Sequence, residues 1–244
     1  MIIKKIFAFF SEHHHRSISN YSKNLDFDIM IDIGAHEGEF LSSFLKIKKI
    51  KKYYCFEPQI KIFKRLKKKY KDNNKIKFFN FPLGDKPKKK KLFLSKLTST
   101  ATLSSFNKVS LYLKFKNFIL NNQNQQSVIV KQKTFDQIFK KTNIKKSFLK
   151  IDVEGYELNV LKGSKKKIKE VKYILIEDQY FNQYKNDFNK VKKFLKKNNF
   201  EILKIFNFPT FHYRDILFKK KPPEISFWGF LICLTLVLRV FWSG

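Results

Sequence analysis

The chain has 244 residues, enough for one domain with a full core, and its 43% of hydrophobic residues excludes the usual type of intrinsically disordered protein. The net charge of +32 is typical of proteins that bind nucleic acids or anionic membranes. Only four of the 52 basic residues are arginines, the side chain best suited to phosphates and base edges, so we interpret the charge mainly as the codon bias of an A/T-rich genome.

Residues 1–24 are predicted to form a leading helix, because their short apolar stretch lacks the length and the cleavage site of a secretory signal. His13, His14 and His15 have no Cys or acidic partner at metal-ligand spacing. We therefore interpret them as a solvated helix end rather than a metal-binding tract.

The next segment, 25–220, alternates short apolar runs with lysine-rich helical stretches, which predicts an α/β domain with a mostly parallel sheet covered on both faces. A hairpin at 200–206 and 212–220 is expected to close the sheet. The expected strands are 29–33, 52–57, 75–83, 147–153 and 171–177, and the expected helices are 37–48, 58–70, 157–169 and 185–198.

The segment 95–126 interrupts this alternation. It is rich in Ser and Thr, then helix-like, and then rich in Asn and Gln. An insertion of this length between two parallel strands is often a lid or a substrate-recognition element, and the alternative is a surface excursion without such a role.

Glycine is scarce in this chain, and several glycines follow predicted strands, where open α/β sheets bind their ligands. Asp32, Gly34 and Gly38 belong to the run DIGAHEG at 32–38, which closes one strand and opens a helix. Gly34 would let the backbone pass close to a bound group, and Asp32 can accept hydrogen bonds or hold an ammonium. The G-x-x-x-G spacing differs from that of a nicotinamide-binding domain.

Glu57 ends the next strand, nineteen positions after Gly38, which is close to the spacing at which an acid binds ribose hydroxyls in nucleoside-binding units. The alternative is an ordinary acidic residue at a helix N-terminus. The sequence has no phosphate-binding loop, so a nucleoside without an obligatory pyrophosphate is expected. S-adenosylmethionine fits this description best.

A third group of polar residues lies in FLKIDVEGYELNVLKG, at 148–163. Asp152, Glu154 and Glu157 fall within eight residues of Lys150, in a chain with few acids. This concentration favours a functional site over a structural turn between a strand and a helix.

The runs DIGAHEG, FEP and KIDVEGYELNVLKG, with TFDQI at 134–138, ILIE at 174–177 and DILF at 215–218, resemble the FkbM family of S-adenosylmethionine-dependent methyltransferases over roughly residues 28–218. The resemblance implies a Rossmann-like class I methyltransferase fold and O-methylation of sugars or other hydroxyls. The family commonly has Asn where this chain has His36. The stretch from Asn80 to Asp85 resembles its third-strand loop, near the adenine.

By this resemblance, the cofactor would be held by Asp32, Gly34, Ala35, Gly38, Glu57 and Asp85. Asp152, Glu154 and Glu157 would face the substrate, together with Lys150. A hydroxyl is a weak nucleophile, so a base that receives its proton assists methyl transfer. The candidate bases are Asp152 and Glu154, followed by His36. A divalent cation held by the carboxylates is the less favoured alternative, and no metal site is assigned.

The segment 221–244 is a hydrophobic tail in which Arg239 is the only charge of residues 225–242. Trp228 and Trp242 near its ends and the preceding lysines favour a membrane contact, with interfacial insertion favoured over spanning. A buried helix, a dimer contact or read-through of unrelated coding sequence are the alternatives. With only two cysteines, the chain is expected in the cytoplasm, attached to the cytoplasmic face of a membrane by this tail.

The leading functional hypothesis is a methyltransferase acting on a hydroxyl of a glycan, a lipid or a small molecule, without specific nucleic-acid binding. An RNA methyltransferase is the alternative that the charge would suit, although the loop after the fourth strand lacks the N/D-P-P-Y type of motif. The third hypothesis is an inactive scaffold of the same fold, tethered to the membrane.

Overall fold

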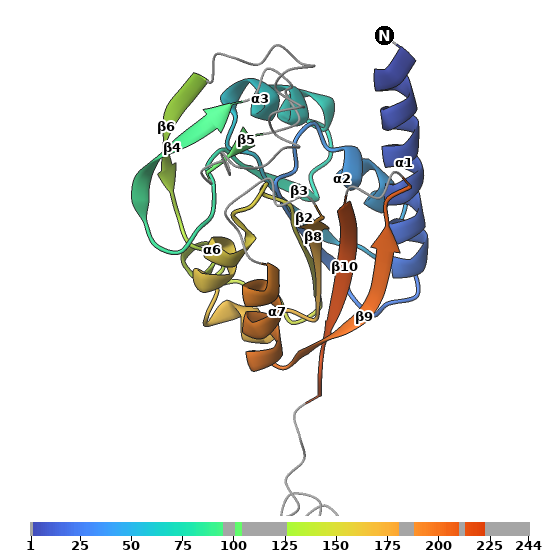
Figure 1. Cartoon of the computed structure of the whole chain (residues 1–244), viewed down its shortest axis with the longest axis vertical. Helices are drawn as coiled ribbons and strands as arrows, with labels where there is room; N and C mark the ends of the chain where they lie inside the picture. The colour runs from blue at the N-terminus through green and yellow to red at the C-terminus, as the bar shows by residue number, and fades with distance from the viewer. Residues whose placement is uncertain (1, 95–100, 104–125, 181–187, 210–212, 223–244) are drawn as a thin grey trace, which may run out of the picture.

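The computed structural model describes residues 2–94, 101–103, 126–180, 188–209 and 213–222 (Figure 1). Its centre is a seven-stranded sheet with the order β3-β2-β1-β7-β8-β10-β9. Five strands are parallel neighbours, and β10 runs antiparallel to both β8 and β9. These strands are β1 (Ile29–Ile33), β2 (Lys52–Phe56), β3 (Ile76–Phe79), β7 (Ser147–Ile151), β8 (Tyr173–Gln179), β9 (Phe200–Asn207) and β10 (Tyr213–Lys220).

The strand order reverses between β1 and β7. The chain moves outward from β1 to β2 and β3, then returns to pair β7 with the opposite edge of β1, with Asp32 in register with Lys150. This reversal is the switch point at which open α/β sheets bind ligands. The mostly parallel sheet and the closing hairpin confirm the predicted Rossmann-like fold class.

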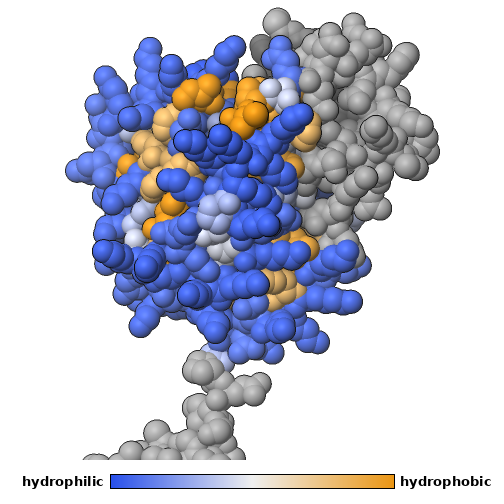
Figure 2. Space-filling model, turned by 90° about the vertical axis from the view of Figure 1, so that its left-hand side faces the viewer, coloured by the Kyte–Doolittle hydropathy of each residue, from blue (hydrophilic) through white to orange (hydrophobic). Residues whose placement is uncertain are grey.

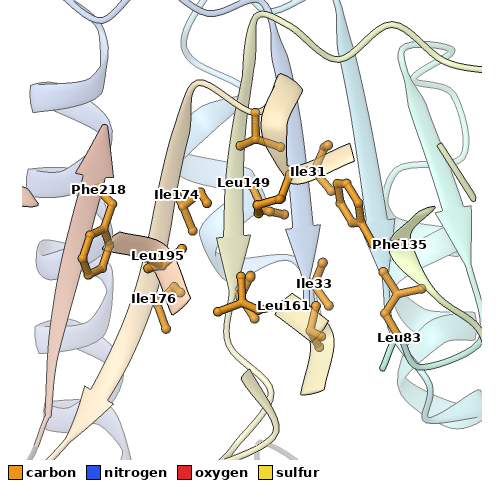
Figure 3. Close-up of a cluster of buried hydrophobic side chains, with 14 of the residues drawn as sticks. Ile31, Ile33, Leu83, Phe135, Leu149, Leu161, Ile174, Ile176, Leu195 and Phe218 are labelled. Atoms are coloured by element: carbon orange, nitrogen blue, oxygen red, sulfur yellow. The ribbon is translucent and has the colours of Figure 1, made fainter. Parts of the chain in front are cut away.

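Both faces of the sheet are buried, because successive strand residues point to opposite sides and both sets are apolar. Ile31 and Leu149 belong to one core cluster, and Met30 and Phe148 belong to the other. Figure 3 shows the first cluster, in which sheet residues meet Leu161 and Leu195 from the helices.

Helices cover the two faces in separate layers. One layer is α1 (Ile2–Ser22), α2 (Glu39–Phe44) and α3 (Ile60–Lys69); the other is α5 (Phe135–Ile138), α6 (Glu157–Lys162), the 3-10 turn Lys167–Glu170 and α7 (Phe188–Lys197). The predicted helix at 37–48 is shorter than expected, and the predicted strand at 75–83 ends at Phe79. The predicted helix at 157–169 is broken after Lys162.

The helix α6 ends at Gly163, which packs closely against the loop that contains Gly84. A Cβ atom there would lie 1.9 Å from the carbonyl oxygen of Gly84, so the helix end fits against this loop only without a side chain. We expect Gly163→Ala to lower the free energy of unfolding by about 1–3 kcal/mol, because the backbone must shift. Urea unfolding measures this change. Exposed Lys162→Ala is the matched control, and equal midpoints for the two variants would contradict the packing argument.

A second, three-stranded antiparallel sheet was not expected from the sequence. It has the order β5-β4-β6 and consists of β4 (Lys88–Leu94), β5 (Ala101–Thr102) and β6 (Gln126–Gln132). Leu92 and Leu103 pack with Tyr156 in a small cluster of their own. The side of the molecule over β4, β6, α6 and α7 is mostly hydrophilic, with a few small hydrophobic groups (Figure 2).

Two predicted segments lie largely or wholly outside the described residues. They are the candidate lid at 95–126, of which only 101–103 and 126 are described, and the hydrophobic tail at 221–244, of which only 221–222 are described. Among the helices that the structure does describe, none has both the length and the hydrophobicity needed to cross a bilayer.

Candidate functional site

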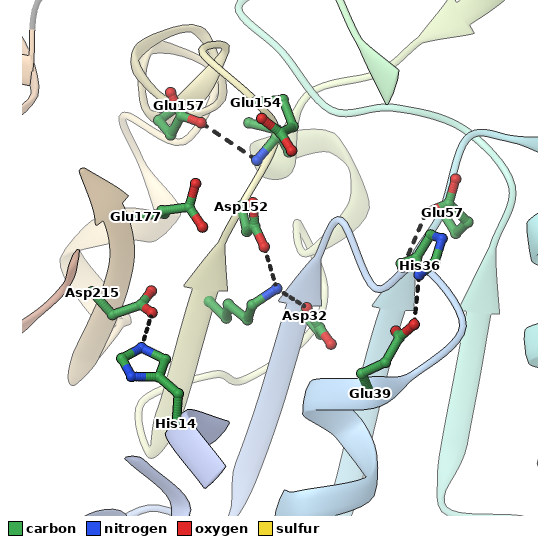
Figure 4. Close-up of polar contacts among 12 residues, drawn as sticks. His14, Asp32, His36, Glu39, Glu57, Asp152, Glu154, Glu157, Glu177 and Asp215 are labelled. Atoms are coloured by element: carbon green, nitrogen blue, oxygen red, sulfur yellow. Dashed lines mark hydrogen bonds and ion pairs between the residues drawn. The ribbon is translucent and has the colours of Figure 1, made fainter. Parts of the chain in front are cut away.

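A pocket of about 260 Å³ opens at the switch point of the large sheet. Its wall comes from the carboxyl ends of β1, β2, β7 and β8 and from the start of the antiparallel strand β10, which reaches the same edge. Figure 4 shows the polar side chains gathered there. The wall carries one lysine, Lys150, and six carboxylates: Glu39, Glu57, Asp152, Glu154, Glu177 and Asp215.

The turn after β1 forms one wall. Gly34 and Ala35 both donate their N–H groups to the carbonyl of Phe56, at 3.0 Å, which draws the turn against the end of β2. Gly34 has a φ of +92°, and a Cβ atom there would lie 1.8 Å from the carbonyl oxygen of Asp152. Glycine at 34 is therefore required by the chain's own β7 loop, which the turn meets at the base of the pocket.

Glu57 is the buried acid at the tip of β2. Its Oε2 accepts the His36 N–H at 3.0 Å and its Oε1 accepts the Gln59 N–H at 2.7 Å. Burial raises the pKa of Glu57 to about 7, although both backbone hydrogen bonds lower it. The Asn80 amide donates to the Glu57 and Pro58 carbonyls, which fixes the third-strand loop beside this carboxylate.

Apolar residues extend the pocket beyond Glu57. Phe81, Pro82 and Leu83 line it together with Phe56, whose ring centroid lies 6.0 Å from that of Phe81. This part of the pocket therefore combines an apolar wall with one buried carboxylate.

Lys150 lies between two aspartates, Asp32 and Asp152. Its Nζ donates to Asp32 Oδ1 at 3.3 Å and to Asp152 Oδ2 at 3.1 Å. Burial lowers the pKa of Lys150, but the charges of Asp152 and Asp32 outweigh it and raise that pKa above its usual value. The ammonium group that Asp32 was expected to hold is therefore that of Lys150, a residue of the same chain.

Asp32 is buried beneath the pocket and does not line it. Its second oxygen, Oδ2, has no hydrogen-bond partner among the described residues, and burial raises the pKa of this carboxyl. The structure therefore assigns Asp32 a direct contact with Lys150.

The other acids of the wall at the ends of β7, β8 and β10 are Glu154, Glu177 and Asp215. Burial, with the charges of Asp152, Glu154 and Asp215, raises the pKa of Glu177 well above its usual value. The amide of Gln179 donates to Glu154 Oε2 at 2.9 Å and to Glu177 Oε1 at 2.8 Å.

Two residues of the wall, His36 and Glu154, have positive φ angles of 47° and 52°. Such conformations cost of order 1 kcal/mol and persist where neighbouring groups hold them. The His36 N–H is held by Glu57, and the Glu154 carbonyl accepts the Thr102 hydroxyl at 2.6 Å. Backbone strain is therefore concentrated at the site.

His36, a candidate base, is engaged with α2. Its Nδ1 lies 2.7 Å from Glu39 Oε1, and its Nε2 is buried without a partner in the described part of the chain. Burial lowers the pKa of His36, but the hydrogen bond and the charge of Glu39 raise it overall. Figure 4 places His36 beside Glu57, away from Asp152 and Glu177.

Besides Asp32, three further predicted site residues do not line the pocket. Asp85 binds Lys88 at 2.8 Å and Gln132 at 3.1 Å, next to the second sheet. Glu157 accepts the Gly155 N–H at 2.9 Å and so holds the loop that carries Glu154. Gly38 begins α2 with a φ of +82°, where a Cβ atom would lie 2.7 Å from the Tyr70 ring.

The histidines of α1 are not a solvated helix end, apart from exposed His13. His14 is buried, with its Nε2 2.8 Å from Asp215 Oδ2, and His15 lines the pocket. The solvated interpretation was wrong because α1 packs on the sheet through Ile18, which a sequence periodicity alone does not reveal.

Sequence reasoning also missed Glu177 and Asp215 as site residues, although both stood in runs that carried the family resemblance. Glu177 ends a predicted strand, as Glu57 does, and this position was the available signal. Asp215 lies near the start of an antiparallel strand, so only the sheet order brings it to the pocket.

The described side chains contain no group of three or more His, Cys, Asp or Glu arranged to hold a metal ion. The residues do fit a nucleoside cofactor that carries positive charge. A buried carboxylate stands beside an apolar wall, and the pocket is strongly acidic. Such a wall would attract a sulfonium or an ammonium.

A search of curated proteins gave no match. Among solved structures, a protein of the NADB-Rossmann superfamily from Streptococcus agalactiae is 12% identical, with a TM-score of 0.48 over 87% of this chain and 70% of that chain. TrmK from M. capricolum, in complex with the natural cofactor product S-adenosyl-homocysteine, is 12% identical, with a TM-score of 0.44 over 83% and 67%. The magnesium protoporphyrin IX methyltransferase of Synechocystis, with bound SAM, is 11% identical, with a TM-score of 0.45 over 87% and 81%.

These structural similarities are too distant to assign a function. The sequence itself matches the family described as the methyltransferase FkbM domain over residues 32–202, which includes the end of β1, the Glu57 tip, the Lys150–Asp152 strand and β8. This match covers more than half of the chain, and the chain therefore belongs to the FkbM family of methyltransferases.

Proposed function

We propose that the protein uses S-adenosylmethionine to methylate a hydroxyl group on a sugar, a glycan, a glycolipid or a related metabolite. One observation carries the proposal: a chain with a net charge of +32 lines the pocket at the switch point of its sheet with six acidic side chains and one lysine. An acidic pocket in a basic protein suits a cationic cofactor and a neutral acceptor that donates hydrogen bonds.

Glu57 is the residue proposed to bind the cofactor's ribose. Its carboxylate is already oriented by the His36 and Gln59 N–H groups, and a carboxylate can accept further hydrogen bonds from two hydroxyls. Phe81 and Leu83 would contact the adenine, and the acidic wall would stabilise the charged methionine part. The cofactor supplies an electrophilic methyl group on a sulfonium.

Asp152 is the residue proposed to receive the proton of the acceptor hydroxyl. Its Oδ2 is held by Lys150, while its Oδ1 makes no hydrogen bond within the described residues, and its side chain is 31% exposed. Asp32 in turn holds Lys150. The carboxylate of Asp152 is therefore fixed through Oδ2, while Oδ1 is free to accept a proton. A general base must be held in place in this way to act on a correctly positioned hydroxyl.

Calorimetry with S-adenosylmethionine tests the cofactor, and transfer of a labelled methyl group to glycans, lipids and RNA in parallel tests the acceptor. We expect micromolar binding, with ΔG near −8 kcal/mol, and label in the glycan or lipid arm. Folded protein that releases no heat would favour the scaffold alternative. Label confined to RNA would identify an RNA methyltransferase, and loss of transfer in EDTA would identify a metal-assisted reaction.

A further inference from the structure

The helix α1 contributes directly to the pocket, although it precedes the region matched by the family. Ser11 and His15 are four residues apart, so they lie on the same side of the helix, and both line the pocket. The His15 ring packs edge-on against Phe40, with centroids 5.3 Å apart. Among the described residues, no group forms a hydrogen bond with the His15 ring, so its polar atoms remain available to a ligand.

A buried contact fixes this part of α1. His14 and Asp215 are both almost fully buried and are joined at 2.8 Å across 201 positions of the chain. The His14 ring also packs edge-on against Phe208 and Tyr213, at 5.3 and 5.7 Å. Figure 4 shows this pair at the β10 side of the pocket. The position of His15 is therefore set by its neighbour rather than by helix propensity alone.

The chemistry around His15 suits a neutral hydroxyl group. Burial, assisted by the charge of Lys150, lowers the pKa of His15 to about 4, so the imidazole is uncharged at neutral pH. An uncharged imidazole has one donor and one acceptor, which matches a hydroxyl. Asp152 and Asp215 line the same pocket and interact electrostatically with His15, so a phosphate or a carboxylate would be repelled there, whereas hydroxyls would find acceptors.

We propose that α1 completes the acceptor site, with His15 forming a hydrogen bond to a hydroxyl of a neutral sugar and the His14–Asp215 pair positioning it. The proposal rests on the proposed function and deepens it. Because α1 and β10 both lie outside residues 32–202, acceptor recognition would depend on segments that the family match does not include.

The test uses the full chain and a panel of uncharged methyl glycosides. Methyl transfer from labelled S-adenosylmethionine gives kcat and KM, and calorimetry in the presence of S-adenosylhomocysteine gives the glycoside Kd. His15→Phe should raise the glycoside KM and Kd about tenfold while leaving the cofactor Kd within about twofold, because one hydrogen bond to the acceptor is lost. His15→Asn, which keeps a donor and an acceptor, should recover part of this loss.

His13→Ala is the matched control, because His13 is exposed on the same helix. For the positioning pair, His14→Leu should raise the glycoside KM without changing the cofactor Kd, and His14→Gln, which keeps a donor for Asp215, should restore it.

Three outcomes would overturn the inference. Equal glycoside KM values in His15→Phe and His13→Ala would show that His15 does not bind the acceptor. Wild-type protein that methylates another acceptor but binds no glycoside would show that the acceptor is not a sugar, although the protein is still a methyltransferase. Wild-type protein that binds no S-adenosylmethionine would remove both the proposed function and this inference.

Discussion

Replacing Asp152 with asparagine is expected to lower kcat about 10²–10⁴-fold, the usual contribution of a general base. Asparagine has nearly the same shape and its oxygen can still accept from Lys150, but it cannot take up a proton. The affinity for S-adenosylmethionine should stay within about threefold, because the change does not touch the ribose side of the pocket. Labelled methyl transfer under saturating cofactor and calorimetry measure the two quantities.

The control for this variant is Asp72→Asn, the same chemical change at an exposed position, and its kcat should equal that of the wild type. If Asp152→Asn retains wild-type kcat, the proton goes elsewhere and Glu154→Gln becomes the next variant. Glu154 ranks second because one of its oxygens already accepts from Gln179. His36 ranks third because its ring is paired with Glu39.

Replacing Glu57 with glutamine is expected to weaken S-adenosylmethionine binding about 10–100-fold, the value of hydrogen bonds to a charged group. The amide would also place an NH2 group against one of the two N–H donors, from His36 and Gln59, that now bind the carboxylate. Calorimetry measures the change. Glu37→Gln, in the turn after β1 but paired with Arg65 at 2.7 Å and away from the pocket, should bind the cofactor normally.

The same carboxylate predicts how cofactor binding depends on pH. Burial raises the pKa of Glu57 to about 7 in the free protein. Ribose hydroxyls donate to the ionised form, so below pH 7 the protein must first release a proton and the cofactor Kd should rise about tenfold per pH unit. Above that pH the Kd should level off. If the cofactor Kd of Glu57→Gln depends on pH in the same way as that of the wild type, a group other than Glu57 is responsible for the pH dependence.

The sequence predicted the sheet well because its strands are buried on both faces and therefore form mostly apolar runs, as in Ile29–Ile33 and Ser147–Ile151, each interrupted by one charged residue. The helix boundaries were less accurate. The helix α6 ends at Gly163, which packs against Gly84, a partner 79 positions away that no local pattern indicates.

The second sheet was missed because its strands have few buried residues. Lys88–Leu94 begins with four lysines, and Gln126–Gln132 leaves Val128 and Ile129 exposed. Both segments resemble polar loops when each is considered alone. Their pairing, with Lys90 opposite Val130, joins segments far apart in the sequence and cannot be predicted from either segment alone.

For the site, motifs after strands identified Gly34, Glu57, Lys150 and Asp152 because such residues lie next to one another in sequence and at one edge of a parallel sheet. They did not identify His15 and Asp215, which reach the pocket through helix packing and through the reversed direction of β10. Glu177 was also missed, although it ends a predicted strand. The site therefore combines a part that local sequence encodes and a part that only the assembled sheet creates.

The buried contact between His14 and Asp215 also bears on how the protein is made. A ribosome produces α1 first and Asp215 201 residues later, a delay of roughly 10–40 s at 5–20 residues per second. During this time the helix has no carboxylate to bind and no β10 to pack beside. The nascent chain therefore cannot form the contact that positions His14 until β10 has been made and joins the sheet.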